Sequence, residues 1–250
     1  MSLTTVRPFE IIKNQYLYKL KSYSRAYTSL IIIQMLAVLF SLGGSGGYGH
    51  GRNNLEINAN IYSPDIIIMF TMIWGFMVAI LITTKAYRYD DFTFVTNRRA
   101  SHLSNIGFLC TASLLGGVTA ELSGYLFKLI VFAFVNHDVV KLETPINSLI
   151  SSGVGIIGTF LYLFIACAVG YLFGMLVQIR KIFAFLLPAI FIGTIFLAGN
   201  VDQFGQFLYT FMKFFVKEPS LTLFFLKAIL TAAILFFATA AISNRLEVKK

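Results

Sequence analysis

The chain has 250 residues, of which 57% are hydrophobic and 12% are charged, and its mean hydropathy is +0.78. Soluble domains carry about 25% charged residues, so this composition excludes an ordinary soluble globular protein. A formal net charge of +9 would favour nucleic acid as a partner of a soluble chain. Here several apolar runs are long enough to span a bilayer, and Lys and Arg that collect in cytoplasmic loops explain the charge instead. No nucleic-acid partner is expected.

The N-terminal segment, residues 1–27, predicts an amphipathic helix on the cytoplasmic face of the membrane. Its aromatic and aliphatic residues recur at spacings of three and four, and most of its basic residues lie between them. This pattern is typical of helices that lie in the membrane interface, although a helix that packs on a partner protein would show it too.

Residues 28–84 contain the first two predicted spans. The first covers about 29–42, and the second covers 64–84 with a proline in its first turn. The first span is extended by a glycine-rich stretch, 43–51, and the polar residues that follow it, up to 63, predict an external loop. Because the glycine run lacks the lysine of a phosphate-binding loop, no nucleotide site is expected there.

The polar segment 85–103 follows the second span and combines acidic, aromatic and basic residues. Carboxylates near its start and arginines near its end suit a short helix across the cytoplasmic face. Such a helix would offer a partner protein aromatic anchors with charged contacts around them. An ordinary cytoplasmic loop would explain the arginines but not the acidic and aromatic cluster. The residues predicted to contact the partner are Tyr89, Asp90, Asp91, Phe92, Phe94, Asn97, Arg98 and Arg99.

Residues 104–198 contain three further predicted spans. The apolar region 104–135 is too long for one upright span, so we expect one long helix, tilted or broken. An external loop separates it from the fourth span at 148–177, and the fifth span at 182–199 contains Pro188, which predicts a kink.

Small residues within these spans recur at four-residue spacing, which lets helices approach closely in lipid. Such rows predict tight helix packing rather than a particular function. The third and fourth spans carry these rows, at Ser113, Gly117 and Gly124 and at Ala166, Gly170 and Gly174.

Three charged residues fall within predicted spans: Glu121, Lys128 and Lys227. An ionisable group inside the membrane is a candidate for function. Glu121 borders the small-residue row, so a transport role and a packing role both remain open for it. Both lysines are expected to extend toward the external interface.

The C-terminal part contains an unusual stretch, 199–219, in which phenylalanines alternate with charged residues. This mixture favours an external helix that dips into the interface over a full span. A sixth span follows at 220–243, and residues 244–250 form a basic tail.

The distribution of basic residues predicts the orientation. With the N-terminus inside, the cytoplasmic segments hold fourteen Lys and Arg and the external segments hold four. This bias predicts an all-α polytopic membrane protein with six transmembrane helices and both termini in the cytoplasm.

No residue set predicts catalysis. The three histidines lie in loops or at interfaces, and no span pairs His with Glu or Ser as an intramembrane protease requires. We therefore expect neither an enzyme, nor a metal site, nor a cofactor bound by this chain.

The layout resembles that of ABC-2-type exporter permeases. The resemblance rests on the amphipathic N-terminal helix, the six spans, the DDFTFVTNRR stretch after the second span and the Phe-rich external stretch before the sixth. It covers nearly the whole chain and is strongest with short exporter permeases of low-GC Gram-positive bacteria, such as those of the phenol-soluble modulin exporter.

The resemblance implies a single permease domain, 1–250, in the bacterial cytoplasmic membrane. A coupling helix at about 89–99 would dock into a separate ABC ATPase subunit, which would bind ATP and Mg²⁺. A second permease, identical or paralogous, would complete the transporter, and 204–217 would be re-entrant. The aromatic spans favour an amphipathic peptide or lipid-like cargo. The alternative is a non-transporting immunity or sensor protein that binds a peptide toxin or another protein.

Overall fold

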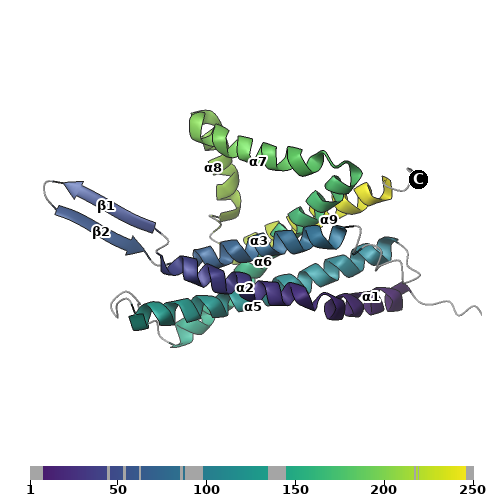
Figure 1. The fold of residues 1–250 in the computed structure, drawn as a ribbon, viewed down its shortest axis with the longest axis horizontal. Helices are drawn as coiled ribbons and strands as arrows, with labels where there is room; N and C mark the ends of the chain where they lie inside the picture. Colours follow the sequence, from purple (N-terminus) through teal and green to yellow (C-terminus); the bar gives the residue numbers. More distant parts are fainter. Residues whose placement is uncertain are drawn as a thin grey trace, which may run out of the picture. The chain divides into compact units, whose positions relative to one another are not determined.

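The computed structural model describes residues 8–43, 46–52, 55–61, 63–84, 87, 98–134, 145–216, 218 and 220–245 (Figure 1). Its helices are α1 (Pro8–Ser22), α2 (Ser24–Leu42), α3 (Asp65–Thr83), α5 (Arg98–Phe134), α6 (Pro145–Ile179), α7 (Phe183–Asn200), α8 (Asp202–Val216) and α9 (Leu221–Arg245). Among the described residues, six helices are long and apolar enough to cross a membrane: α2, α3, α5, α6, α7 and α9. The chain is thus a helical, polytopic membrane protein, and the predicted fold class is confirmed.

The chain falls into two compact units. Unit 1 contains Met1–Gln15, Phe76–Ile106 and Cys167–Lys250, and unit 2 contains Tyr16–Gly75 and Gly107–Ala166. Four helices, α1, α3, α5 and α6, contribute one end to each unit. The segment between α3 and α5 therefore starts and ends in unit 1.

The boundary between α1 and α2 lies earlier than the sequence predicted. The first helix ends at Ser22, and Tyr23 adopts φ −96° and ψ 30° between the two helices. The spanning helix α2 therefore begins at Ser24, and not near residue 29. A turn formed by Tyr and Ser, without Gly or Pro, leaves no breaker signal in the sequence.

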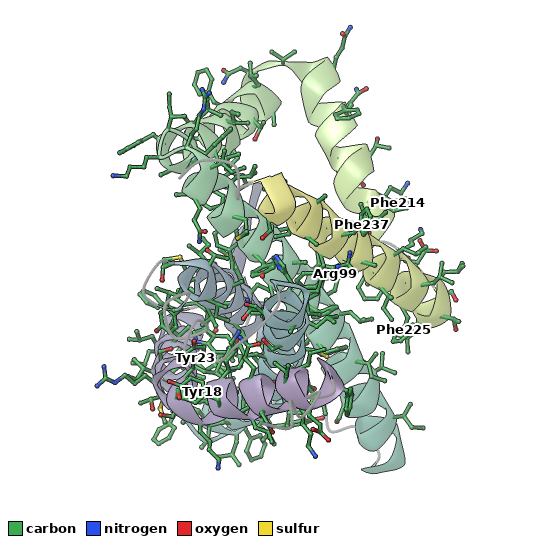
Figure 2. All side chains as sticks on the ribbon, turned by 90° about the vertical axis from the view of Figure 1, so that its right-hand side faces the viewer. Tyr18, Tyr23, Arg99, Phe214, Phe225 and Phe237 are labelled. Atoms are coloured by element: carbon green, nitrogen blue, oxygen red, sulfur yellow. The ribbon has the colours of Figure 1, made fainter. Side chains whose placement is uncertain are left out.

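The end of α1 lies against α5 within unit 2. Tyr16 packs on Gly107, and the ring of Tyr23 meets the edge of Phe108 with centroids 5.6 Å apart. The last part of α1 and the residue that follows it therefore contact adjacent residues of α5. Tyr18 lies on the exposed side of α1, and Figure 2 labels both Tyr18 and Tyr23.

The glycine-rich extension of the first span and the external loop predicted after it together contain a β-hairpin. Strand β1 (Gly46–Arg52) pairs antiparallel with β2 (Leu55–Ile61), and Gly46 lies opposite Ile61. The apolar residues of β2 alternate with polar ones, which is the period of a strand. The glycines of β1 hid its strand character, because glycine is depleted in strands.

Unit 2 is held by an apolar cluster shared by three helices. Its buried members come from α2, α3 and α5, and they are Ala37, Val38, Ile67, Ala120, Phe127 and Val131. Helix α5 is one unbroken helix of 37 residues, and α6 has 35. At 1.5 Å per residue each is more than 50 Å long, compared with about 30 Å for the hydrocarbon core of a bilayer. Both helices must therefore tilt or extend beyond the membrane core.

Unit 1 contains α7, α8 and α9. None of the residues of α7, all of which are described, is buried, so most of the surface of this apolar helix is available to lipid or to another protein. Helix α8 has 15 residues, fewer than the roughly 20 that a helical span needs. Helix α9 buries a row at three- and four-residue spacing, while Phe225 and Phe237 remain exposed (Figure 2).

Candidate functional site

Most residues of the predicted partner-contact segment lie outside the described part of the chain. These are Tyr89, Asp90, Asp91, Phe92, Phe94 and Asn97. Arg98 is the first residue of α5, and Arg99, labelled in Figure 2, is exposed on the first turn of that helix. What the structure does define is the pair of helix ends that carry this segment: the end of α3 and the start of α5.

The end of α3 lies directly against α6 at two glycines. A Cβ at Gly170 would overlap the carbonyl oxygen of Phe76 and lie 3.0 Å from its Cα, and a Cβ at Gly174 would overlap Oγ1 of Thr83. Thr83 is the last residue of α3 and is buried. The two backbones therefore approach more closely than any residue larger than glycine permits at these positions.

The start of α5 is held against the same turn of α6 by polar contacts. The Tyr171 hydroxyl lies 2.7 Å from Nδ1 of His102, and the Asn105 amide donates a hydrogen bond to the Tyr171 hydroxyl at 3.1 Å. Tyr171 and Asn105 are both buried. When Nδ1 of His102 carries no proton, it accepts a hydrogen bond from the phenol, and the hydroxyl then donates to one residue of α5 and accepts from another.

Tyr171 also contacts α9. Its ring centroid lies 5.9 Å from that of Phe236, and Phe236 belongs to the buried row of α9. One turn of α6, from Gly170 to Gly174, thus contacts the end of α3, the start of α5 and the middle of α9. Sequence analysis missed Tyr171, His102 and Asn105. The only available signal was a tyrosine next to a glycine in a small-residue row.

The small-residue row of α5 lies against neighbouring helices in unit 2. A Cβ at Gly117 would lie 3.1 Å from the backbone nitrogen of Phe160 in α6, and a Cβ at Gly124 would lie 3.5 Å from Cβ of Pro64. Ser113 is fully buried, and Ala166 is half-buried. Gly117 is therefore a point of close contact between α5 and α6.

Glu121 lies over a glycine of α6. A Cβ at Gly155 would lie 2.9 Å from Oε2 of Glu121, so the glycine leaves the space that the carboxylate occupies. Lys128 lies over the ring of Tyr125 at 5.3 Å from its centroid, and the Tyr125 hydroxyl is hydrogen-bonded to Ser152 of α6. Within the described residues no ion pair joins Glu121 to Lys128.

Lys227, which was predicted to extend toward the external interface, makes two contacts that the sequence did not indicate. Its ammonium forms an ion pair with Glu218 and lies 3.8 Å from the ring centroid of Phe214. Phe214 belongs to the last turn of α8, whereas Lys227 lies near the start of α9. These contacts join the end of α8 to α9, and Glu218 had not been singled out from the sequence.

A buried amide in unit 2 was also missed. Nε2 of Gln34 in α2 donates to Oγ1 of Thr119 in α5 at 3.0 Å and to Oγ1 of Thr71 in α3 at 3.3 Å. Gln34 is 4% exposed. A glutamine in an apolar run signals a buried polar contact, but the sequence does not show which helices supply its partners.

Within the part of the chain that the structure describes, no three His, Cys, Asp or Glu side chains lie close enough to hold a metal ion. No family model matches this sequence, and comparisons with curated proteins and with solved structures find no similar chain. A function must therefore be inferred from the residues and contacts described above.

Proposed function

We propose that this chain is the transmembrane permease subunit of an ATP-driven exporter. The segment 85–103 is its contact with a separate ATPase subunit, and amphipathic peptides or lipid-like molecules are its cargo. The observation that carries the proposal is how the two helix ends that flank this segment are packed. The helix ends on both sides of it, at Thr83 and His102, contact one turn of α6.

A segment that only connects two spans does not require its flanking helix ends to pack on one shared helix. A segment on which another protein acts does require such packing, because displacement of a loosely held loop would not move the membrane helices. The acidic, aromatic and basic residues of 89–99 supply the anchors and charged contacts that an interface requires. The resemblance to ABC-2-type permeases supports the same assignment of this segment.

The remaining features agree with a transport subunit. Six apolar helices form the membrane part, and Glu121 lies inside one of them. The exposed surface of α7 and the exposed row of α9, with Phe225 and Phe237, provide wide apolar surfaces. In a transporter, such surfaces contact lipid, a second permease or an apolar cargo. The bacterial cytoplasmic membrane, which the resemblance implies, is part of this proposal.

Co-purification tests the proposal. The chain is expressed with the ATPase encoded beside its gene, solubilised in detergent, captured by a tag and assayed for ATP hydrolysis. We expect the ATPase to be recovered with the parent chain and to be lost with Asp91→Ala and Arg98→Ala. Lys181→Ala is the matched control, because Lys181 is exposed in the other predicted cytoplasmic loop.

Two results would contradict the proposal. If the parent chain is recovered without any nucleotide-hydrolysing partner, the immunity or sensor function becomes the better explanation. If the ATPase is recovered equally with the parent chain and both variants, the contact lies elsewhere and the role of 89–99 is wrong.

A further inference from the structure

The contacts around Tyr171 connect the helix ends beside the segment 85–97 to the membrane helix α6. We infer that the turn of α6 from Gly170 to Gly174 receives the motion of the segment 85–97, and that Tyr171 and His102 are the positioning residues that transmit it. This inference rests on the proposed function and adds the route by which the ATPase would act on the spans.

The first step is geometric. Helix α3 ends at Thr83 and α5 begins at Arg98, so a force on the residues between them is passed to these two helix ends. The α3 end cannot slide freely along α6, because Gly170 and Gly174 bring the two helices into backbone contact at Phe76 and Thr83. Close-packed helices of this kind move together.

The second step concerns α5. Ala100, Ser104 and Asn105 are buried near the start of α5, whereas Arg99 and Leu103 are exposed. His102 and Asn105 are three residues apart and therefore share one face of the helix. Their hydrogen bonds both end on a single atom, the hydroxyl oxygen of Tyr171. The removal of that one oxygen would release both contacts without any loss of ring packing.

The third step is that α6 can carry the motion onward. It is an unbroken helix from Pro145 to Ile179, about 52 Å long at 1.5 Å per residue. Its cytoplasmic end under the predicted orientation carries Tyr171, and its other end lies near Ile150, which is 63% exposed. A tilt or rotation of α6 at Tyr171 would therefore change the surroundings of Ile150.

The experiment uses the complete complex with its ATPase and measures the two ends of α6. Ile150→Cys is introduced as the labelling site, and the rate of its reaction with a membrane-impermeant maleimide is measured without nucleotide and with ATP plus vanadate. The variants Tyr171→Phe, His102→Ala and their combination are compared with the parent. Tyr162→Phe is the control, because it removes a phenol hydroxyl from α6 at another position.

In the parent and in Tyr162→Phe, ATP plus vanadate should change the labelling rate of Ile150→Cys by about fivefold or more, within the usual range of coupling between distant sites. Tyr171→Phe and His102→Ala should each remove most of this change, and the double variant should be no worse than either. Such non-additivity is expected when two residues act through one shared contact.

A second pair of variants tests the α3 side. Gly174→Ala places a Cβ on Thr83 and should abolish the nucleotide-dependent change, while the added Thr83→Ala removes the overlapping oxygen and should restore part of it. If these variants merely unfold the protein, the thermal stability of the purified complex falls and no partial recovery is seen. That result would overturn the role of this contact.

The outcomes separate the inference from the proposed function. If no ATPase co-purifies with the parent, the function and the inference are both wrong. If the complex forms but nucleotide leaves the labelling of Ile150→Cys unchanged, or changes it equally in all variants, the exporter assignment remains and the route through Tyr171 is wrong. If Tyr171→Phe lowers stability but leaves the nucleotide response unchanged, Tyr171 has only a packing role.

Discussion

Gln34 in α2 donates a hydrogen bond to Thr119 in α5 at 3.0 Å, and both side chains lie within helices that are long and apolar enough to span a membrane. The same amide nitrogen lies 3.3 Å from Thr71 of α3. Three helices of unit 2 are thus joined at one amide, in addition to the apolar cluster of Ala37, Ile67 and Phe127.

This relationship predicts a modest loss of stability for Gln34→Leu. Thr71 and Thr119 keep their own hydrogen bonds to the carbonyls of Ile67 and Leu115, so the substitution leaves no hydroxyl donor unsatisfied. The expected decrease in the free energy of unfolding is about 1 kcal/mol, as is typical of hydrogen bonds between membrane helices. Thermal unfolding in detergent measures it, with Gln206→Leu in the exposed part of α8 as the control. Equal or higher stability of Gln34→Leu would show that the contact is dispensable.

Alanine substitutions at two glycines of α6 should have opposite effects on stability. Gly170→Ala forces a Cβ against the backbone of Phe76, and such overpacking costs about 1–3 kcal/mol. Gly153 in the same helix has nothing within 4 Å of its added Cβ, so Gly153→Ala should leave stability unchanged or raise it by up to about 1 kcal/mol through helix propensity. Thermal unfolding of the two variants side by side checks both. If both lose stability equally, α3 and α6 do not make the close contact described here.

These examples show which parts of the structure the sequence could predict. Hydropathy identified the six spans, because a run of about 20 apolar residues has few alternatives to a membrane helix. The four-residue spacing marked Gly117, Gly170 and Gly174, since only small residues permit close backbones. The partners of Gln34 and Tyr171 could not be predicted, because they depend on which helix lies beside which and on how each is rotated.

Other differences between the predicted and the observed structure arose where the local residue types gave no clear signal. The turn at Tyr23 has no Gly or Pro to mark it, and the strand β1 contains four glycines among its seven residues. The contact residues at 89–97 lie outside the described part of the chain, so their role remains a prediction from the sequence.

The ion pair between Lys227 and Glu218 predicts a coupled effect on the junction of α8 and α9. Side-chain exposures of 23% and 16% place the pair at the margin of the protein interior, where solvent screens it only in part. Lys227→Met and Glu218→Gln should each lower stability, and a double-mutant cycle should give a coupling of about 0.5–1 kcal/mol. High salt should weaken the coupling, because mobile ions screen partly exposed pairs. Additive effects of the two substitutions would mean that the pair contributes nothing.

Substitutions of Glu121 distinguish a role of its charge in transport from a role of its side chain in packing. Glu121→Gln keeps the shape of the side chain over Gly155 but removes its charge. If the charge takes part in transport, the variant should keep its thermal stability while export of a fluorescent amphipathic Leu–Lys peptide from proteoliposomes decreases. Glu121→Leu provides the contrast, because it also removes the polar atoms. Unchanged export and stability in Glu121→Gln would leave the carboxylate with a packing role only.

The predicted orientation places fourteen basic residues in the cytoplasm and four outside, and it can be measured residue by residue. Lys181 lies between α6 and α7, and Lys213 lies in α8; both side chains are exposed. In whole cells, a membrane-impermeant maleimide should label Lys213→Cys but not Lys181→Cys, and permeabilised cells should allow both to react. Neither position is packed against the helix contacts described above, so both variants should fold. Labelling of Lys181→Cys in intact cells would reverse the predicted topology, and the segment 85–103 would then lie on the wrong side of the membrane to meet an ATPase.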